Sequence, residues 1–144
     1  MDVKYWDSYY QQHGNDKNIS ESSTFADFCL NKFFASKDIN IVELGSGNGR
    51  DAIYFAQHQI NIIAIDQSTV AIDIEKELLL PEVSKFLHPK ALDFVLEDYS
   101  TYEPIDVFYS RFTMHAISED EEKILLPNLY KYLKTGGLLC IEAR

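Results

Sequence analysis

One segment of the chain, Val42-Glu43-Leu44-Gly45-Ser46-Gly47-Asn48-Gly49-Arg50-Asp51, sets the topology that the other elements must fit. It closes an apolar run that begins at Ile39 and is typical of a buried strand, and it leads into a helix over Asp51–His58. The glycines between strand and helix tolerate positive φ and let a ligand approach the backbone closely. The helix start presents free N–H groups and a positive dipole end, which favour an anion. We expect a ligand at this turn, with a tight turn that binds nothing as the alternative.

The spacing of the glycines narrows the class of ligand. It is G-x-G-x-G, whereas a nicotinamide-binding turn has G-x-G-x-x-G and would place its third glycine at Arg50. A second strand, Ile60–Ile65, ends at Asp66, which lies 21 residues after Gly45. An acid about 20 residues after the first glycine is where nucleotide-binding βαβ units hold the ribose hydroxyls. The two signals together favour a nucleoside-containing ligand over a solvated turn.

Strands and helices alternate along the rest of the chain. This alternation implies a parallel sheet with helices on both faces, and right-handed crossovers lead to the strand order 3-2-1-4-5. The expected fold is therefore a Rossmann-like three-layer αβα sandwich, with ligands at the carboxyl ends of its strands. The remaining elements are a helix capped by Ser68, strands at Leu92–Leu96, Ile105–Tyr109 and Leu138–Ile141, and a helix from the capping box Ser118-x-x-Glu121 that is stopped by Gly136-Gly137.

Composition disfavours several classes of partner. The 144 residues suit one domain, which we divide into an N-terminal helical lid segment (1–35) and a core (36–144). Acids outnumber bases 23 to 13, so nucleic acid and anionic membranes are disfavoured. No apolar run reaches the roughly 18 residues of a membrane span, and the first residues do not have the pattern of a signal peptide, so we expect a cytoplasmic protein. Cys29 and Cys140 have apolar neighbours and are interpreted as reduced core residues.

These motifs resemble those of the class I S-adenosylmethionine-dependent methyltransferases, over roughly residues 20–144. They occur in the order that this family has, and the first of them is fairly specific. The segments that carry the resemblance are Glu43–Gly49, Asp66, Glu97-Asp98, Ile105–Ser110 and Leu133–Leu139.

The resemblance implies which residue would hold each part of S-adenosylmethionine. Glu43 would bind the ammonium, Asp66 the ribose and Asp98 the adenine amino group, while the Tyr99 backbone N–H would meet a ring nitrogen. Ser110 and Arg111 would lie beside the sulfonium and the carboxylate of the cofactor. A loop-capping role for Glu43 and a turn role for Asp98 are the alternatives. No metal site is expected. The residues assigned to cofactor binding are Glu43, Gly45, Ser46, Gly47, Asn48, Gly49, Arg50, Asp66, Gln67, Asp98, Tyr99, Ser110 and Arg111.

His115 is the one histidine in an expected ligand loop, and it is our candidate catalytic base. Methyl transfer to oxygen needs a deprotonated nucleophile, and a histidine titrates near neutral pH. A structural role at the start of a helix is the alternative. The aromatic segment that contains Tyr5, Trp6, Tyr9 and Tyr10 is interpreted either as a lid, because aromatic faces attract a sulfonium, or as packing against the sheet edge.

The chain departs from the family where it stops, at Glu142-Ala143-Arg144, because the family sheet has two further strands after the fifth. We expect strand five to be an exposed edge that is open to self-association, and this chain alone to lack part of the substrate-facing wall. The expected function is methylation of a small polar molecule on oxygen or nitrogen. A non-catalytic S-adenosylmethionine-binding module or scaffold is the main alternative, and another nucleotide-binding Rossmann protein is the weaker one.

Overall fold

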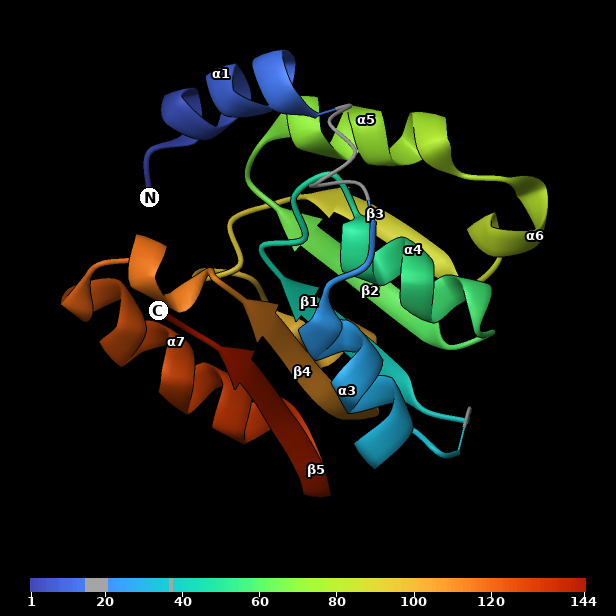
Figure 1. Ribbon diagram of the computed structural model, residues 1–144. Coiled ribbons are helices and arrows are strands. Elements are labelled where there is room, and N and C mark those ends of the chain that lie inside the picture. The colour runs from blue at the N-terminus through green and yellow to red at the C-terminus, as the bar shows by residue number, and fades with distance from the viewer. Residues whose placement is uncertain (15–20, 37) are drawn as a thin grey trace.

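A wholly parallel, five-stranded sheet forms the centre of the computed structural model, which describes residues 1–14, 21–36 and 38–144. Its strand order is β3-β2-β1-β4-β5, so the predicted α/β fold and topology are confirmed (Figure 1). The order reverses between β1 and β4, which is where such sheets bind ligands. The strands are β1 (Asn40–Leu44), β2 (Asn61–Asp66), β3 (Leu87–Ala91), β4 (Ile105–Arg111) and β5 (Leu133–Glu142).

Helices cover both faces of the sheet, and α1 lies across the carboxyl ends of the strands (Figure 1). On one face, α3 and α4 pack on a core that contains Phe55 and Tyr109. On the other face, α7 and η1 pack on a core that contains Tyr99 and Phe108. The bounds are α1 (Val3–His13), α3 (Thr24–Phe33), α4 (Arg50–Gln57), α5 (Thr69–Leu78), α6 (Pro81–Ser84), η1 (Tyr99–Tyr102), η2 (Met114–Ala116) and α7 (Glu119–Tyr132).

Serine caps fix the starts of three helices. Ser23, Ser68 and Ser118 each accept a hydrogen bond of 3.0–3.1 Å from the backbone N–H three residues further on. At α7 the predicted capping box is complete, because the Glu121 carboxylate also accepts from the Ser118 N–H at 2.7 Å. Caps of this kind satisfy backbone donors that have no partner within the helix.

The predicted third strand was wrong by five residues. The strand is Leu87–Ala91, and the apolar run Leu92–Leu96 forms the turn after it. An edge strand needs little apolar sequence and tolerates Pro89, which hid it from a search for β-branched residues. Phe94 and Val95 are apolar because the turn tucks them into the core beside α7, and Asp93 shapes that turn by accepting from the Val95 N–H at 2.9 Å.

The predicted stop at Gly136-Gly137 was also wrong. Helix α7 ends at Tyr132, and both glycines lie inside β5. The pairing of β5 with β4 is irregular at these glycines. Leu133 pairs with Ile105 and Leu138 pairs with Val107, so β5 has more residues than β4 between the two pairs. Gly136 has φ +81°, a conformation that suits glycine and lets the strand take up the extra residues.

Two further sequence inferences concern the cysteines and the membrane. Cys29 and Cys140 are both free and buried in the core on the α3 side. A hydrogen bond between the two thiols raises the pKa of Cys29. In the part of the chain that the structure describes, no helix is long and apolar enough to cross a bilayer.

Candidate functional site

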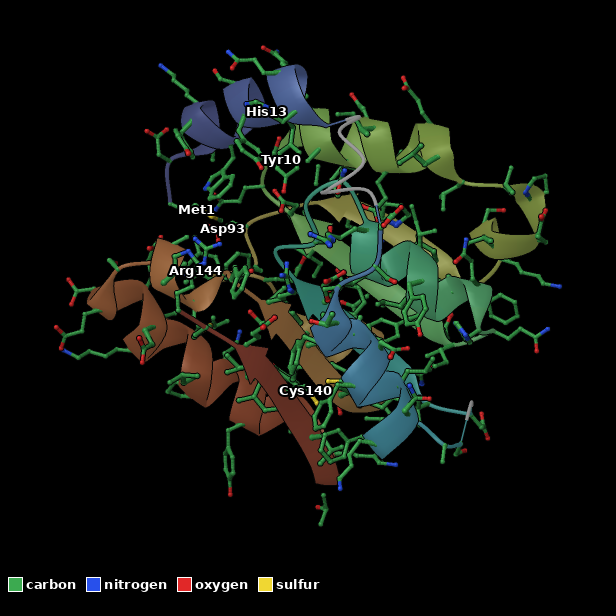
Figure 2. The ribbon with its side chains drawn as sticks, viewed as in Figure 1. Met1, Tyr10, His13, Asp93, Cys140 and Arg144 are labelled. Atoms are coloured by element: carbon green, nitrogen blue, oxygen red, sulfur yellow. The ribbon has the colours of Figure 1, made fainter. Side chains whose placement is uncertain are left out.

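A cavity of about 350 Å³ opens at the carboxyl ends of β1, β2 and β4, beneath α1. Its floor is the glycine-rich turn after β1, its roof is the aromatic face of α1, and one wall is the segment that follows β4. In Figure 2, Tyr10 points from α1 toward the strand ends, and Arg144 lies beyond the end of β5. The sequence-predicted residues that line the cavity are Glu43, Gly45, Ser46, Asn48, Arg50, Asp66, Arg111 and His115.

The glycine turn can be built only from residues without a side chain at its key positions. Gly47 has φ +58°, and a Cβ placed there would collide with the Tyr10 hydroxyl. Gly49 has φ +85°, and a Cβ there would lie 2.5 Å from the Glu75 Cγ atom. Positive φ is strained for other residues, so the conformation and the close approach both require glycine. The turn is thus held against the α1 roof on one side and against α5 on the other.

Asp66 joins the turns that follow β1 and β2. Its carboxylate accepts from the Gly47 N–H at 2.9 Å and from the Ser68 N–H at 2.8 Å. The side chain is nearly buried but lines the cavity, so its remaining lone pairs face the space where a ligand would lie. Burial raises the pKa of Asp66, and the two backbone donors oppose that shift.

Buried carboxylates give the floor of the cavity an excess of acceptors. Glu43 at the end of β1 lines the cavity and is 3% exposed, whereas Glu75 on α5 is 0% exposed and lies against the glycine turn outside the lining. Each has one carboxylate oxygen without a hydrogen-bond partner. Burial raises the pKa of both groups, and nearby acids, Asp51 for Glu43 and Asp66 for Glu75, raise it further. A cation placed beside Glu43 would supply the missing partner and relieve the repulsion.

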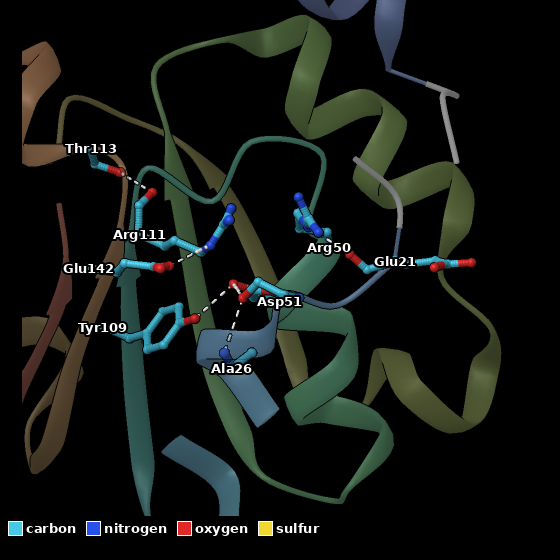
Figure 3. A network of polar contacts seen from close by, with 9 residues as sticks. Glu21, Ala26, Arg50, Asp51, Tyr109, Arg111, Thr113 and Glu142 are labelled. Atoms are coloured by element: carbon cyan, nitrogen blue, oxygen red, sulfur yellow. Dashed lines mark hydrogen bonds and ion pairs between the residues drawn. The ribbon is translucent and has the colours of Figure 1, made fainter. Parts of the chain in front are cut away.

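Asp51 has a structural role next to the site (Figure 3). Its carboxylate accepts from the Ser23 N–H and the Ser23 hydroxyl, both at 2.8 Å, and from the Tyr109 hydroxyl at 2.7 Å. These bonds tie α4 to the start of α3 and to β4, which leaves Asp51 little capacity for a ligand. Arg50 beside it donates from Nε to the Glu21 carbonyl at 2.6 Å.

The segment after β4 forms the wall that carries positive charge. Arg111 donates from Nε to the Glu142 carboxylate at 2.8 Å, which joins the ends of β4 and β5 (Figure 3). The Thr113 hydroxyl donates to the Leu44 carbonyl at 3.0 Å, so this wall is fixed to the end of β1. His115 lies in η2, exposed at the rim of the cavity.

A comparison with known proteins identifies this arrangement. A family model described as a methyltransferase domain matches residues 42–139, which is more than half of the chain. The chain belongs to this methyltransferase domain family. The resemblance of the sequence to the class I S-adenosylmethionine-dependent methyltransferases is thereby confirmed.

Individual relatives of the methyltransferase domain are distant. Thiopurine S-methyltransferase of Photobacterium profundum is 21% identical over 98% of this chain and 70% of its own length. The tRNA N(3)-methylcytidine methyltransferase Mettl2 of Drosophila melanogaster is 27% identical over 94% of this chain and 45% of its own length. The glycopeptide N-methyltransferase MtfA, solved with S-adenosylmethionine, has a TM-score of 0.73 and 13% identity, over 85% of this chain and 50% of that one. The chain therefore spans about half the length of Mettl2 and of MtfA.

The aromatic segment of this methyltransferase domain forms the roof of the cavity. Tyr5, Trp6, Tyr9 and Tyr10 all line it from α1, and the four rings contact one another in sequence. Helix α1 is attached to the core where Ser68 donates to the Asp7 carboxylate at 2.5 Å. Burial raises the pKa of Tyr10, which therefore stays a neutral phenol over the glycine turn. This placement supports the lid interpretation over packing at the sheet edge.

The structure does not bring Asp98 and Tyr99 to the cavity. The Asp98 carboxylate accepts from the Ser100 N–H at 3.0 Å at the exposed start of η1. Hydrogen bonding from the Ser100 side chain, and then from this N–H, lowers the pKa of Asp98. The Tyr99 ring is buried in the α7-side core, where its hydroxyl donates to the Phe94 carbonyl. Asp98 lines a separate shallow surface depression beside α7, and Tyr99 is packed in the core beneath it. They were assigned from a third strand placed too late in the sequence.

Asp93 is the acid that follows the actual β3, and sequence reasoning gave it no role; like Asp98, it is not among the residues that line the cavity. The backbone N–H of Leu92 donates to the Asp66 carbonyl at 2.9 Å, so Asp93 begins the turn beside the end of β2. The tripeptide Ala91-Leu92-Asp93 is the sequence feature that would have pointed to Asp93, provided that the strand is taken to end at Ala91. Of the other predicted residues, Gly47, Gly49, Gln67 and Ser110 flank the cavity-lining positions in the chain without lining the cavity themselves.

Proposed function

We propose that this chain binds S-adenosylmethionine in the cavity under α1 and that the protein transfers its methyl group to a small polar acceptor, on oxygen or nitrogen. The observation that carries the proposal is the floor of buried carboxylates with an unpartnered Glu43 oxygen beneath an aromatic roof. S-adenosylmethionine carries two positive groups, an ammonium and a sulfonium. Carboxylates suit the first of these, and aromatic rings attract the second.

Each part of the cofactor has a candidate partner at the strand ends. Glu43 faces the position of the ammonium, and Asp66 offers its free lone pairs to the ribose hydroxyls. Asp93, at the end of β3, takes the adenine role that the sequence resemblance had given to Asp98. The Gly47 turn brings its backbone against the methionine end, with Arg50 at the start of α4 for the carboxylate.

For this reaction, the protein mainly orients the reactants and excludes water. Bound there, S-adenosylmethionine supplies a methyl group on a cationic sulfur, which departs with the electron pair of the broken carbon–sulfur bond as S-adenosylhomocysteine. The aromatic roof of α1 shields this position from solvent. For an oxygen acceptor, His115 at the rim accepts the hydroxyl proton, whereas a neutral amine acceptor needs no base before transfer.

The domain organisation is part of the same proposal: 1–144 form one domain, 1–35 act as the lid segment, and 36–144 form the core. A non-catalytic binding module is the rival function. The observation that favours it is the exposed edge strand β5, where Leu139 is 43% exposed.

Two measurements test the proposal. Calorimetry of the chain with S-adenosylmethionine, S-adenosylhomocysteine and NAD is expected to show binding of the first two only, because the glycine turn departs from the dinucleotide pattern. Release of S-adenosylhomocysteine by the whole protein with a panel of small hydroxyl and amine compounds, with tRNA as a further arm, separates an enzyme from a binding module. Binding of NAD, or no binding of S-adenosylmethionine, would contradict the proposal.

A further inference from the structure

The arginines of this chain are distributed unevenly. The sequence has ten lysines and only three arginines, within a net charge of −10. All three arginines, Arg50, Arg111 and Arg144, line the cavity, and no lysine of the described residues does. Arginine presents a planar fork of donors that matches an oxyanion, which lysine does not. The cavity therefore combines an acidic floor with guanidinium groups.

Two of these arginines share one aromatic ring at the rim. The guanidinium carbon of Arg111 lies 4.1 Å from the centre of the Phe112 ring, and that of Arg144 lies 4.7 Å from it. Phe112 has φ +55°, which is a strained conformation for a bulky residue. The strain is held by a hydrogen bond from the Phe112 N–H to the Glu142 carbonyl at 2.8 Å. Strained backbone persists where the surroundings impose it, often at ligand sites.

Within the described residues, the two guanidinium groups of this rim have one ion-pair partner between them. Arg111 has one carboxylate partner, Glu142, which bonds its Nε atom. Arg144 forms no ion pair with any carboxylate of the described residues. The cofactor carries a single carboxylate. The sequence resemblance places Arg111 beside it, whereas the proposal above gives that role to Arg50 at the glycine turn, so Arg111 can serve another anion. Figure 3 shows that Arg50 and Arg111 come from different elements, the start of α4 and the end of β4.

We infer that Arg144 and Arg111, both held against the Phe112 ring, bind an oxyanion of the methyl acceptor, a carboxylate or a phosphate next to the atom that receives the methyl group. This inference rests on the proposed function and narrows its acceptor from a polar molecule to an anionic one. The Glu142 bond fixes Arg111 through Nε, which leaves its outer nitrogens to face the ligand. Arg144 supplies the second donor set, and its stacking on Phe112 orients the guanidinium at little entropic cost.

A matched series of small probes tests the inference. Benzoate, phenyl phosphate, benzamide and benzylamine share one ring and differ in charge, and each is titrated into the chain saturated with S-adenosylhomocysteine. Wild type is expected to bind benzoate or phenyl phosphate at least tenfold more tightly than benzamide, and the preferred anion shows which oxyanion fits. Arg144→Gln is expected to reduce the ratio of anion affinity to benzamide affinity by about tenfold or more. It should leave the affinities for benzamide and S-adenosylhomocysteine unchanged.

A control variant removes the same charge elsewhere. Lys123→Gln lies on the exposed face of α7, where Lys123 pairs only with Glu119, and it is expected to keep the anion preference. Equal affinity of wild type for benzoate, phenyl phosphate and benzamide would overturn the inference alone. An Arg144→Gln variant whose affinity for S-adenosylhomocysteine falls by the same factor as its affinity for the anion would also overturn the inference, because Arg144 would then bind the cofactor. A wild-type chain that binds no S-adenosylhomocysteine overturns the proposed function and this inference together.

Discussion

Replacing Gly47 by alanine adds one methyl group at the point where the α1 roof touches the glycine turn. The φ of +58° alone costs alanine about 1–2 kcal/mol, because its Cβ crowds the carbonyl in the left-handed region. The same Cβ collides with the Tyr10 hydroxyl and lies 2.9 Å from the ring carbon that bears it, so the ring must move out of its half-buried position. Loss of roughly half the burial of an aromatic side chain adds about 1 kcal/mol. The free energy of unfolding should fall by about 2–3 kcal/mol in total.

A double-mutant cycle in thermal unfolding separates the two contributions. For a domain of this size each kcal/mol lowers Tm by about 3 °C, so Gly47→Ala should lower it by about 6–9 °C. In a Tyr10→Ala background the added methyl meets no ring, and the cost should shrink to the backbone part, about 3–6 °C. Wild type at 100 times the dissociation constant of S-adenosylmethionine should gain about 2.7 kcal/mol, and Gly47→Ala should gain almost nothing.

Two results would refute this reasoning. If Gly47→Ala costs the same with and without the Tyr10 ring, α1 does not rest on the turn, and the lid interpretation is wrong. If Gly47→Ala keeps the full gain in stability when S-adenosylmethionine is added, the turn does not hold the cofactor. The two results are independent, since the cycle is measured without ligand.

Four further predictions concern the acids of the site. Asp66→Asn should weaken S-adenosylmethionine binding by about 2 kcal/mol in calorimetry, because a charged acceptor for the ribose is lost. Asp93→Asn should raise the dissociation constant severalfold while Asp98→Asn leaves it unchanged; the reverse ranking would restore the original assignment. Burial raises the pKa of Glu75 in the folded state. The free energy of unfolding should therefore fall as pH rises from 4.5 through the raised pKa, because the folded state disfavours the charged carboxylate. Glu75→Gln should therefore unfold at a higher temperature than wild type at pH 8, with the difference vanishing near pH 4, and a less stable variant at pH 8 contradicts this. Because the pKa of Glu43 is raised in the empty site, cofactor binding should release protons and strengthen with pH; calorimetry in buffers of different ionisation enthalpy measures the release, which Glu43→Gln should abolish.

Sequence reasoning succeeded where local chemistry and periodicity agree. The turn at Gly45–Gly49 and the acid at Asp66 follow from conformational freedom and from strand spacing, so they could be placed without coordinates. The third strand could not, because an edge strand with a proline and polar residues lacks the signature of a buried strand, while Phe94 is apolar for reasons of tertiary packing. Because the third strand was placed too late in the sequence, the adenine role was assigned to Asp98.

Other parts of the site arise only from folding. Nothing in the linear sequence shows that the ring of Phe112 meets Arg144, which follows β5 and lies more than thirty residues later in the chain. The contact between Glu75 and the glycine turn depends on how α5 packs, and the charge of a glutamate, unlike its position on α5 beside Ala71 and Ile72, suggests the solvent face. The burial of polar residues under the turn therefore could not be predicted before the position of α5 was known.

The two amide bonds to the Asp66 carboxylate have a consequence for how the empty site fluctuates. Gly47 and Ser68 belong to different turns, yet their N–H groups share one acceptor. If that carboxylate swings away, both amides lose protection in the same event, so their hydrogen-exchange rates should rise and fall together with pH and with ligand. A ribose that engages Asp66 would then slow exchange at two positions 21 residues apart in the chain, and a single spectroscopic experiment on two backbone amides would report the occupancy of the pocket.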